Sequence, residues 1–252
     1  MKTKLLLLAS FALAIPAANA ATTIFSHTFD EGTGGLDGTA VDVGTGSWEA
    51  APTVNANGAF TDVGSATLAF TPSQGTLYQL DARIIGITGN ANWVALGFAN
   101  GRSTISNTNS RFASQSGVVV EGRAWMMARG DNGSATNRVF TEGTLAGSGF
   151  DWNGTIANAN GGDLDMRILL DTTGGAGTWT ATWFAKRPAD GSYTEVESAR
   201  LLPNESIDSV GFALSDSATT ATLQSFSLTQ IPEPSAALLG GLGMLALLRR
   251  RR

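Results

Sequence analysis

The feature that most constrains the fold is a succession of short apolar or alternating runs separated by clusters of Gly, Asn and Asp. No stretch keeps apolar residues at helical spacing for more than a couple of turns, which disfavours helices. Ten such runs lie at residues 24–29, 65–70, 77–87, 93–98, 118–128, 164–171, 178–185, 193–202, 210–214 and 223–228. Short strands at this regular spacing predict an all-β fold built as an antiparallel β-sandwich.

The clearest pair of predicted strands lies between residues 164 and 185. Every second residue from Leu164 to Leu170 is Leu, Met or Ile, so one face of this strand is apolar. The segment that follows, residues 172–177, reads TTGGAG. A Gly-rich loop between two such runs predicts a β-hairpin.

The chain begins with the pattern of a secretory signal peptide. Two lysines precede an apolar stretch from Leu5 to Ile15, and small residues follow at Ala18 and Ala20. This layout predicts cleavage after Ala20, with residues 1–20 as the leader and export through the inner membrane. About eleven apolar residues would rise only ~16 Å as a helix, which is too short for a stable membrane anchor.

Behind the leader, residues 21–230 are long enough for one all-β domain, and no internal repeat divides them. This passenger holds twenty Asp and Glu against ten Lys and Arg, a net charge near −10. Nucleic-acid binding is therefore not expected, because it relies on basic residues that neutralise phosphates. The chain has no cysteine, which excludes disulfides, thiolate metal ligands and a cysteine nucleophile.

Two pairs of carboxylates have a spacing that could serve a glycosidase. Asp163 with Asp165, and Glu195 with Glu197, are two residues apart, so each pair lies on one face of a strand. We expect these side chains to be solvated on an outward face, and we assign no catalytic residue. A hydrolase triad is disfavoured because His27 is the single histidine. One imidazole also disfavours a zinc site.

Other binding chemistry is limited, and the sequence assigns no cofactor and no metal ligand. Calcium needs only carboxylates and carbonyls, so the Asp-rich loop from Asp37 to Asp42 could hold it, but no ligand spacing supports this. Tryptophan faces suit the apolar side of a sugar ring. Trp93, Trp179 and Trp183 lie in predicted strands and are expected in the core. Trp152 lies in a polar loop and is the candidate glycan contact.

Three segments of the passenger resemble bacterial concanavalin-A-like or laminin-G-like jelly rolls: FDEGTGGLDGTAVDVGTGSWEA, NWVALGFANG and DLDMRILLDTTGGAGTWTATWFA. This resemblance covers most of residues 21–230. It implies two packed antiparallel sheets of curved strands, in a fold whose members include glycan binders, enzymes and structural modules. Glycosidases of this fold usually carry a run of the form E-x-D-x-x-E, which neither DLDMRI nor EVESAR contains.

The last residues read IPEPSAALLGGLGMLALLRRRR. Pro232 and Pro234 flank Glu233 and hold this stretch extended, because proline fixes φ and lacks an N–H. Residues 235–248 are apolar and small, and as a helix they would span ~21 Å. Four arginines that can stop the segment at the cytoplasmic headgroups close the chain: Arg249, Arg250, Arg251 and Arg252.

This tail is similar to the PEP-CTERM sorting signal, which consists of a Pro-Glu-Pro motif, a short transmembrane helix and an Arg-rich cluster. The motif falls on Pro232, Glu233 and Pro234, the helix on residues 235–248, and the cluster on the four terminal arginines. Residues 231–252 then form the sorting signal, with Ile231 where the family often has Val. The resemblance implies processing at or near the motif by an exosortase, a membrane cysteine transpeptidase of Gram-negative bacteria that make exopolysaccharide.

The sequence therefore favours an exported, non-catalytic protein that is held briefly in the inner membrane by its tail. Its partners would be the exosortase and exopolysaccharide, and its final place the cell surface or the extracellular matrix. Two other classes stay open. An extracellular carbohydrate-active enzyme would need a cleft that places one carboxylate pair beside an exposed Trp. A structural or adhesive protein without a ligand would have a flat sheet face lined by Thr and Ser.

Overall fold

A computed structural model of the chain describes residues 20–87, 89–101, 121–130, 137–142, 149–152, 155–156, 162–214 and 221–232. The expected leader up to Asn19, the expected helix at 235–248 and the arginine cluster lie outside this range. Within it the secondary structure consists of strands, and none of the described residues belongs to a helix that could cross a membrane. The chain divides into one compact unit, Ala21–Ile231, and a second unit made of Met1–Ala20 and Pro232–Arg252.

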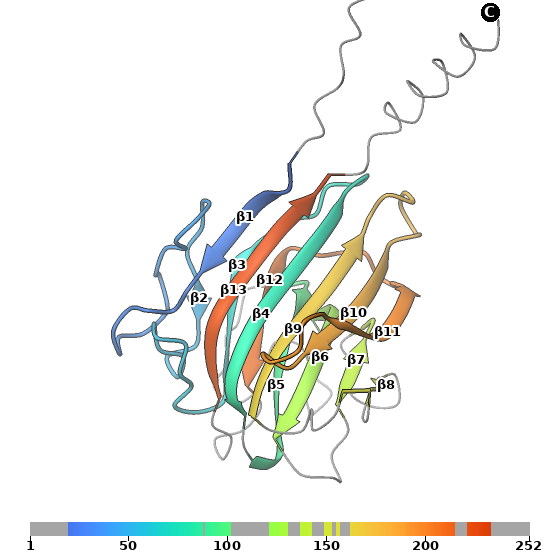
Figure 1. The fold of residues 1–252 in the computed structure, drawn as a ribbon. Helices are drawn as coiled ribbons and strands as arrows, with labels where there is room; N and C mark the ends of the chain where they lie inside the picture. The colour runs from blue at the N-terminus through green and yellow to red at the C-terminus, as the bar shows by residue number, and fades with distance from the viewer. Residues whose placement is uncertain are drawn as a thin grey trace, which may run out of the picture. The chain divides into compact units, whose positions relative to one another are not determined.

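The first sheet of the unit Ala21–Ile231 has six strands, and every neighbouring pair is antiparallel (Figure 1). Its strand order is β1 (Thr22–His27), β13 (Thr222–Ile231), β4 (Leu77–Ile87), β9 (Gly162–Asp171), β10 (Thr180–Lys186) and β11 (Thr194–Leu201). The last strand in sequence, β13, is thus an interior strand. Its residue Ile231 still pairs with Leu77 of β4.

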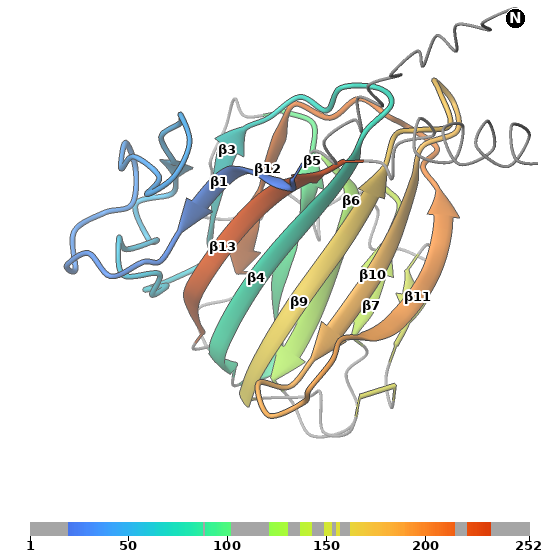
Figure 2. The ribbon, with the colours of Figure 1, turned by 45° about the horizontal axis from the view of Figure 1, so that its top comes forward.

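The second sheet has seven strands, also antiparallel throughout. Its order is β2 (Glu49–Ala50), β3 (Gly64–Ala69), β12 (Ser209–Leu214), β5 (Gly89–Ala99), β6 (Gly122–Gly130), β7 (Arg138–Phe140) and β8 (Phe150–Asp151). The two sheets lie face to face, as Figure 2 shows. The predicted antiparallel β-sandwich is confirmed.

The core fills the space between the sheets. In β9 the alternation predicted from the sequence holds, because Leu164, Met166, Ile168 and Leu170 are fully buried. They belong to one cluster with inward residues of the other sheet, such as Phe212. This two-layer packing accounts for the period-2 pattern, since each strand needs one apolar face toward the opposite sheet.

Each of the ten predicted runs overlaps a strand of the structure, with ends that differ by a few residues, and residues 118–120 of one run lie outside the described residues. The predicted hairpin is also present, because β9 and β10 pair from Asp171 with Thr180 onward. Gly175 and Gly177 in its loop have positive φ values of 92° and 81°, a conformation that favours glycine. The strands β2, β7 and β8 were not predicted from the sequence.

Candidate functional site

The candidate glycan contact Trp152 is buried rather than exposed. Only 1% of its surface is accessible, and it belongs to the main core cluster. Its neighbour Asp151 points to the surface and pairs with Arg138 at 2.7 Å. The prediction of an exposed ring is wrong because polar neighbours in sequence do not set the direction of a side chain in an extended segment. The other five tryptophans are also 9% exposed or less, as expected for Trp93, Trp179 and Trp183.

The two members of the first carboxylate pair, Asp163 and Asp165, lie in different environments. Asp163 is exposed and accepts a hydrogen bond from the backbone N–H of Gly86 at 3.0 Å. Asp165 is only 8% exposed and lies 3.8 Å from Arg83 and 3.5 Å from Lys186. The expectation that Asp165 is solvated is therefore wrong, because basic side chains from both neighbouring strands surround its carboxylate.

The second carboxylate pair divides in the same way. Glu195 is exposed, whereas Glu197 accepts a hydrogen bond from Nε of Arg200 at 2.6 Å. The two members of each pair therefore differ in exposure and in their polar partners.

A different group of residues gathers on the outward face of the six-stranded sheet. The strand register places Asp81 of β4 opposite Arg167 of β9, and Arg83 of β4 opposite Asp165 of β9. Asp165 also lies opposite Lys186 of β10. Opposite charges at directly facing positions stabilise antiparallel strands. We call the following residues the charged patch: Asp81, Arg83, Asp165, Arg167, Lys186 and Tyr193.

Tyr193 lies at the centre of the interactions in the charged patch. The Arg167 guanidinium is 3.9 Å from the centre of its ring, and the Lys186 ammonium is 5.1 Å away. Its hydroxyl donates to Asp81 at 3.4 Å, while Arg167 approaches the same carboxylate at 2.6 Å. Burial and, next, the negative charge of Asp81 raise the pKa of the Tyr193 phenol above its ordinary value. The phenol therefore stays neutral and can donate a hydrogen bond.

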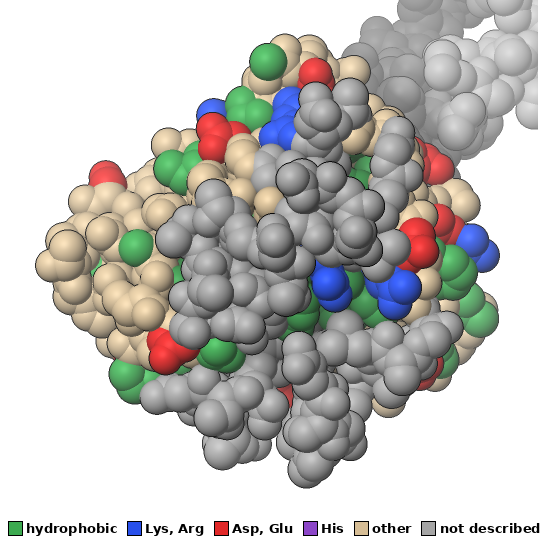
Figure 3. Space-filling model, turned by 90° about the horizontal axis from the view of Figure 1, so that it is seen from below, with side chains coloured by type: hydrophobic (Ala, Val, Ile, Leu, Met, Phe, Trp, Pro, Cys, Tyr) green, Lys and Arg blue, Asp and Glu red, His purple; other side chains and the backbone are tan. Residues whose placement is uncertain are grey.

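The charged patch surrounds an open depression of about 350 Å³, which Ala82 and Ser225 also line. Three basic side chains face two carboxylates here, so the patch is positive although the passenger is acidic. On the described part of the surface seen from below, acidic and basic side chains are interspersed (Figure 3). Guanidinium, ammonium and hydroxyl donors in a shallow depression can hydrogen-bond several oxygens of one ligand. The sequence did not indicate this site, because its members come from strands far apart in the chain.

Asp37 and Asp42, the two ends of the predicted calcium loop, have different hydrogen-bond partners. Asp37 accepts a hydrogen bond from the backbone N–H of Ala50 at 3.0 Å. Asp42 instead accepts from Thr28, and it joins His27 and Glu31 as the group of potential metal ligands found among the described residues. Calcium binding by the loop from Asp37 to Asp42 thus stays a prediction.

Two of the predicted processing positions lie within the described residues. Ala20 is exposed and precedes β1, and Pro232 follows β13 directly. Ala18, Glu233, Pro234 and the four terminal arginines lie outside the described residues.

Comparison with known families decides the nature of this tail, because residues 230–252 match the PEP-CTERM protein-sorting motif. The chain ends in a PEP-CTERM sorting motif. The motif indicates export and sorting by an exosortase at the membrane. No curated protein matches the chain.

Several solved β-sandwich structures are similar to the chain at low identity. An endo-1,3-beta-glucanase from Streptomyces sioyaensis is 13% identical, with 88% of this chain and 99% of that chain covered and a TM-score of 0.47. Arcelin-5, a lectin-like defense protein from Phaseolus vulgaris, is 12% identical, covers 85% and 100%, and has a TM-score of 0.47. The seed lectin of Lotus tetragonolobus is 11% identical, covers 84% and 99%, and has a TM-score of 0.48.

Proposed function

We propose that the chain is an exosortase-sorted surface or matrix protein whose β-sandwich binds extracellular polysaccharide without cleaving it. The observation that carries the proposal is the PEP-CTERM motif at residues 230–252. The motif begins where β13 ends, so sorting acts directly at the border of the folded domain. Signal cleavage after Ala20, the transient membrane anchor at 235–248 and the final attachment are parts of this proposal.

Polysaccharide binding is supported by the charged patch. Arg83, Arg167 and Lys186 present donors around the depression, and sugar hydroxyls and uronate carboxylates are acceptors for such donors. Binding would then depend on hydrogen bonds and charge rather than on stacking against tryptophan, since all six tryptophans are buried. A positive patch on an acidic passenger favours an anionic polysaccharide.

A non-catalytic role is supported by the different surroundings within each pair, since Asp165 and Glu197 form ion pairs whereas Asp163 and Glu195 are exposed. An extracellular carbohydrate-active enzyme stays the second candidate, because Asp163 and Glu195 are exposed carboxylates on the same sheet. Polysaccharide cleavage by the purified protein, abolished by Asp163→Asn with Asp165→Asn or by Glu195→Gln with Glu197→Gln, would favour that candidate.

The test of sorting changes Pro232 and Pro234 to Ala in a host that has an exosortase. The substitution removes the rigid extended element but keeps the apolar segment and the arginines, so the variant should stay in the membrane as a full-length precursor. Pro203→Ala, at an exposed loop position, is the matched control and should mature like the parent. Fractionation and intact-mass measurement follow the product. Maturation of the double variant to the same mass and place as the parent would refute the proposal.

A further inference from the structure

His27 is a buried histidine whose ring nitrogens have no hydrogen-bond partner among the described residues. The side chain, at the end of β1, is 1% exposed. Its ring lies 4.4 Å from the ring of Phe29 and 5.9 Å from that of Trp48. Leaving a buried polar group unsatisfied costs about 1–3 kcal/mol. The environment of His27 therefore calls for a partner on its nitrogens.

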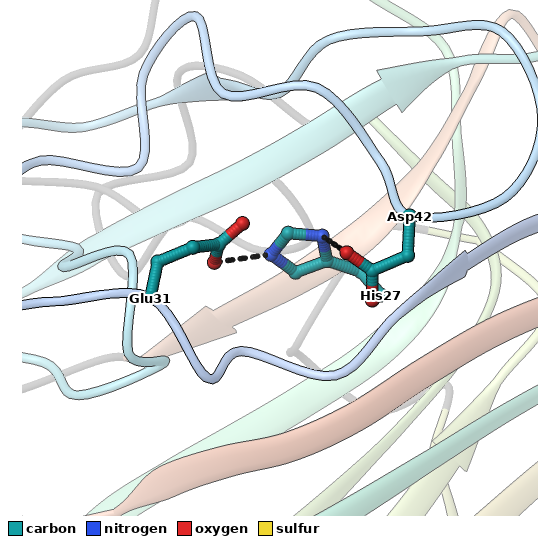
Figure 4. A group of neighbouring side chains, drawn as sticks. All are labelled: His27, Glu31 and Asp42. Carbon is teal, nitrogen blue, oxygen red and sulfur yellow. Dashed lines mark ion pairs between the residues drawn. The ribbon is translucent and has the colours of Figure 1, made fainter.

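Two carboxylates flank the imidazole, one beside each nitrogen (Figure 4). Glu31 Oε2 lies 3.1 Å from Nε2, and Asp42 Oδ1 lies 3.6 Å from Nδ1. One ligand atom from each of the three residues lies within 4.8 Å of the others. Two ligands of one ion with bonds of about 2.1 Å are separated by about 3.0–3.5 Å, so ligand atoms up to 4.8 Å apart must approach one another by up to about 1.5 Å to share an ion at one ring nitrogen.

The backbone holds both carboxylates in place. Phe29, between His27 and Glu31, has a φ of 51°, the left-handed region that non-glycine residues rarely adopt. This local turn directs Glu31 back to the ring. The backbone N–H of Asp42 donates to the carbonyl of Ser26 at 2.9 Å, next to His27 in β1. Asp42 Oδ2 accepts from the Thr28 backbone N–H and hydroxyl at 2.8 and 2.9 Å, which leaves Oδ1 toward the imidazole.

Among the described residues, no Lys or Arg pairs with this cluster. Glu31 and Asp42 form ion-pair contacts with His27. The 3.1 Å contact of Glu31 with Nε2 does not have hydrogen-bond geometry. Both carboxylate side chains are 36% exposed, so an ion and its remaining water ligands can reach the cluster from solvent.

We propose that His27, Glu31 and Asp42 bind one divalent transition-metal ion, with water completing its coordination. An imidazole nitrogen with two carboxylates suits Zn²⁺ or Mn²⁺, whereas Ca²⁺ takes oxygen ligands. The ion ties the end of β1 to the loop that carries Asp42. This site is independent of the charged patch and of polysaccharide binding.

The test uses the full chain in mild detergent, treated with a chelator and then titrated with Zn²⁺ in a calorimeter. We expect one equivalent to bind, and Glu31→Gln and Asp42→Asn each to weaken binding at least about tenfold. Asp30→Asn is the matched control, because Asp30 is exposed, adjacent in sequence and outside the cluster. It should bind Zn²⁺ as the parent does, and Ca²⁺ at the same concentration should not compete.

A second readout does not depend on the variants remaining folded. Because His27 is the single histidine of the chain, imidazole nitrogen NMR of the parent gives one set of signals. Zn²⁺ should shift one of these nitrogens strongly at one equivalent. Unchanged imidazole signals, or equal Zn²⁺ affinities for Glu31→Gln, Asp42→Asn and Asp30→Asn, would overturn the proposal. Competition by Ca²⁺ would overturn the assignment to a transition metal.

Discussion

Thr22 is the register partner of Gln230 in the antiparallel pair of β1 and β13. The strand that begins just after the predicted signal cleavage point is therefore bonded to the strand that ends at the sorting motif. Because β13 lies between β1 and β4, the six-stranded sheet is complete only when the last residues of the passenger pair with both strands. The sandwich therefore cannot be completed without the strand that directly precedes the motif.

This topology predicts a sharp boundary for truncation. A chain that ends at Ile231 keeps β13 and should give a strand-dominated far-ultraviolet circular dichroism spectrum and a cooperative thermal transition. A chain that ends at Ala221 lacks an interior strand and leaves β1 and β4 without their shared partner, so it should not fold. A cooperative transition in the shorter chain, or a helical spectrum in the longer one, would contradict the assigned fold.

The sequence predicted the sandwich because its longer strands give recognisable apolar runs, which alternate in β4, β9 and β10 and are continuous in β12. The three strands that it missed have two or three residues, so they contain less than two periods of the pattern. Their positions depend on neighbours such as β3 and β6, which supply the hydrogen bonds. Local sequence carries no information on such pairing.

The sites were less predictable than the strands. Asp81 and Arg167 are 86 residues apart in sequence, and only the strand register makes them an ion pair. Trp152 had a polar local sequence but a buried side chain. The His27 cluster depends on the turn at Phe29 and on the bond from Asp42 to Ser26, neither of which composition reveals.

Gly211 of β12 should not tolerate a larger residue. A Cβ at this position would lie 2.1 Å from the carbonyl oxygen of Ala66 and 2.9 Å from Cα of Thr67, both backbone atoms of β3. Gly211→Ala should therefore lower the free energy of unfolding by about 2 kcal/mol, because two paired strands must separate. Gly191→Ala, with no atom within 4 Å, should change it by less than about 0.5 kcal/mol. Urea denaturation of both variants tests the comparison.

Substitutions in the charged patch should weaken polysaccharide binding more than substitutions elsewhere on the surface. Arg83→Gln with Arg167→Gln removes two donors around the depression and should reduce retention on an anionic polysaccharide column at least about tenfold. Arg200→Gln is the control, because Arg200 lies over the Phe150 ring, away from the patch. Increasing salt should weaken the parent's retention. Equal retention of the double variant and the control would place binding elsewhere.

Tyr193 should give the protein a specific alkaline sensitivity. Its pKa is raised in the folded state above the ordinary value of 10.0. The stability that the neutral phenol contributes is therefore complete below that value and is lost as the pH rises toward the higher folded pKa. Between about pH 9 and about pH 11, the free energy of unfolding of Tyr193→Phe should fall less steeply than that of the parent. Parallel curves from urea titrations would contradict the raised pKa of Tyr193.

Substitution of the four terminal arginines tests retention of the precursor in the membrane separately from processing at the Pro-Glu-Pro motif. Replacing Arg249 to Arg252 with Ser removes the charges that hold the carboxyl end at the cytoplasmic face. A segment of fourteen residues spans only ~21 Å as a helix, so without these charges the precursor should pass through the membrane and be released unprocessed. Replacement of the same four residues with Lys keeps the charge and should preserve membrane retention. Intact masses of the membrane and soluble fractions distinguish the outcomes, and retention of the Ser variant would show that the apolar segment suffices as a stop.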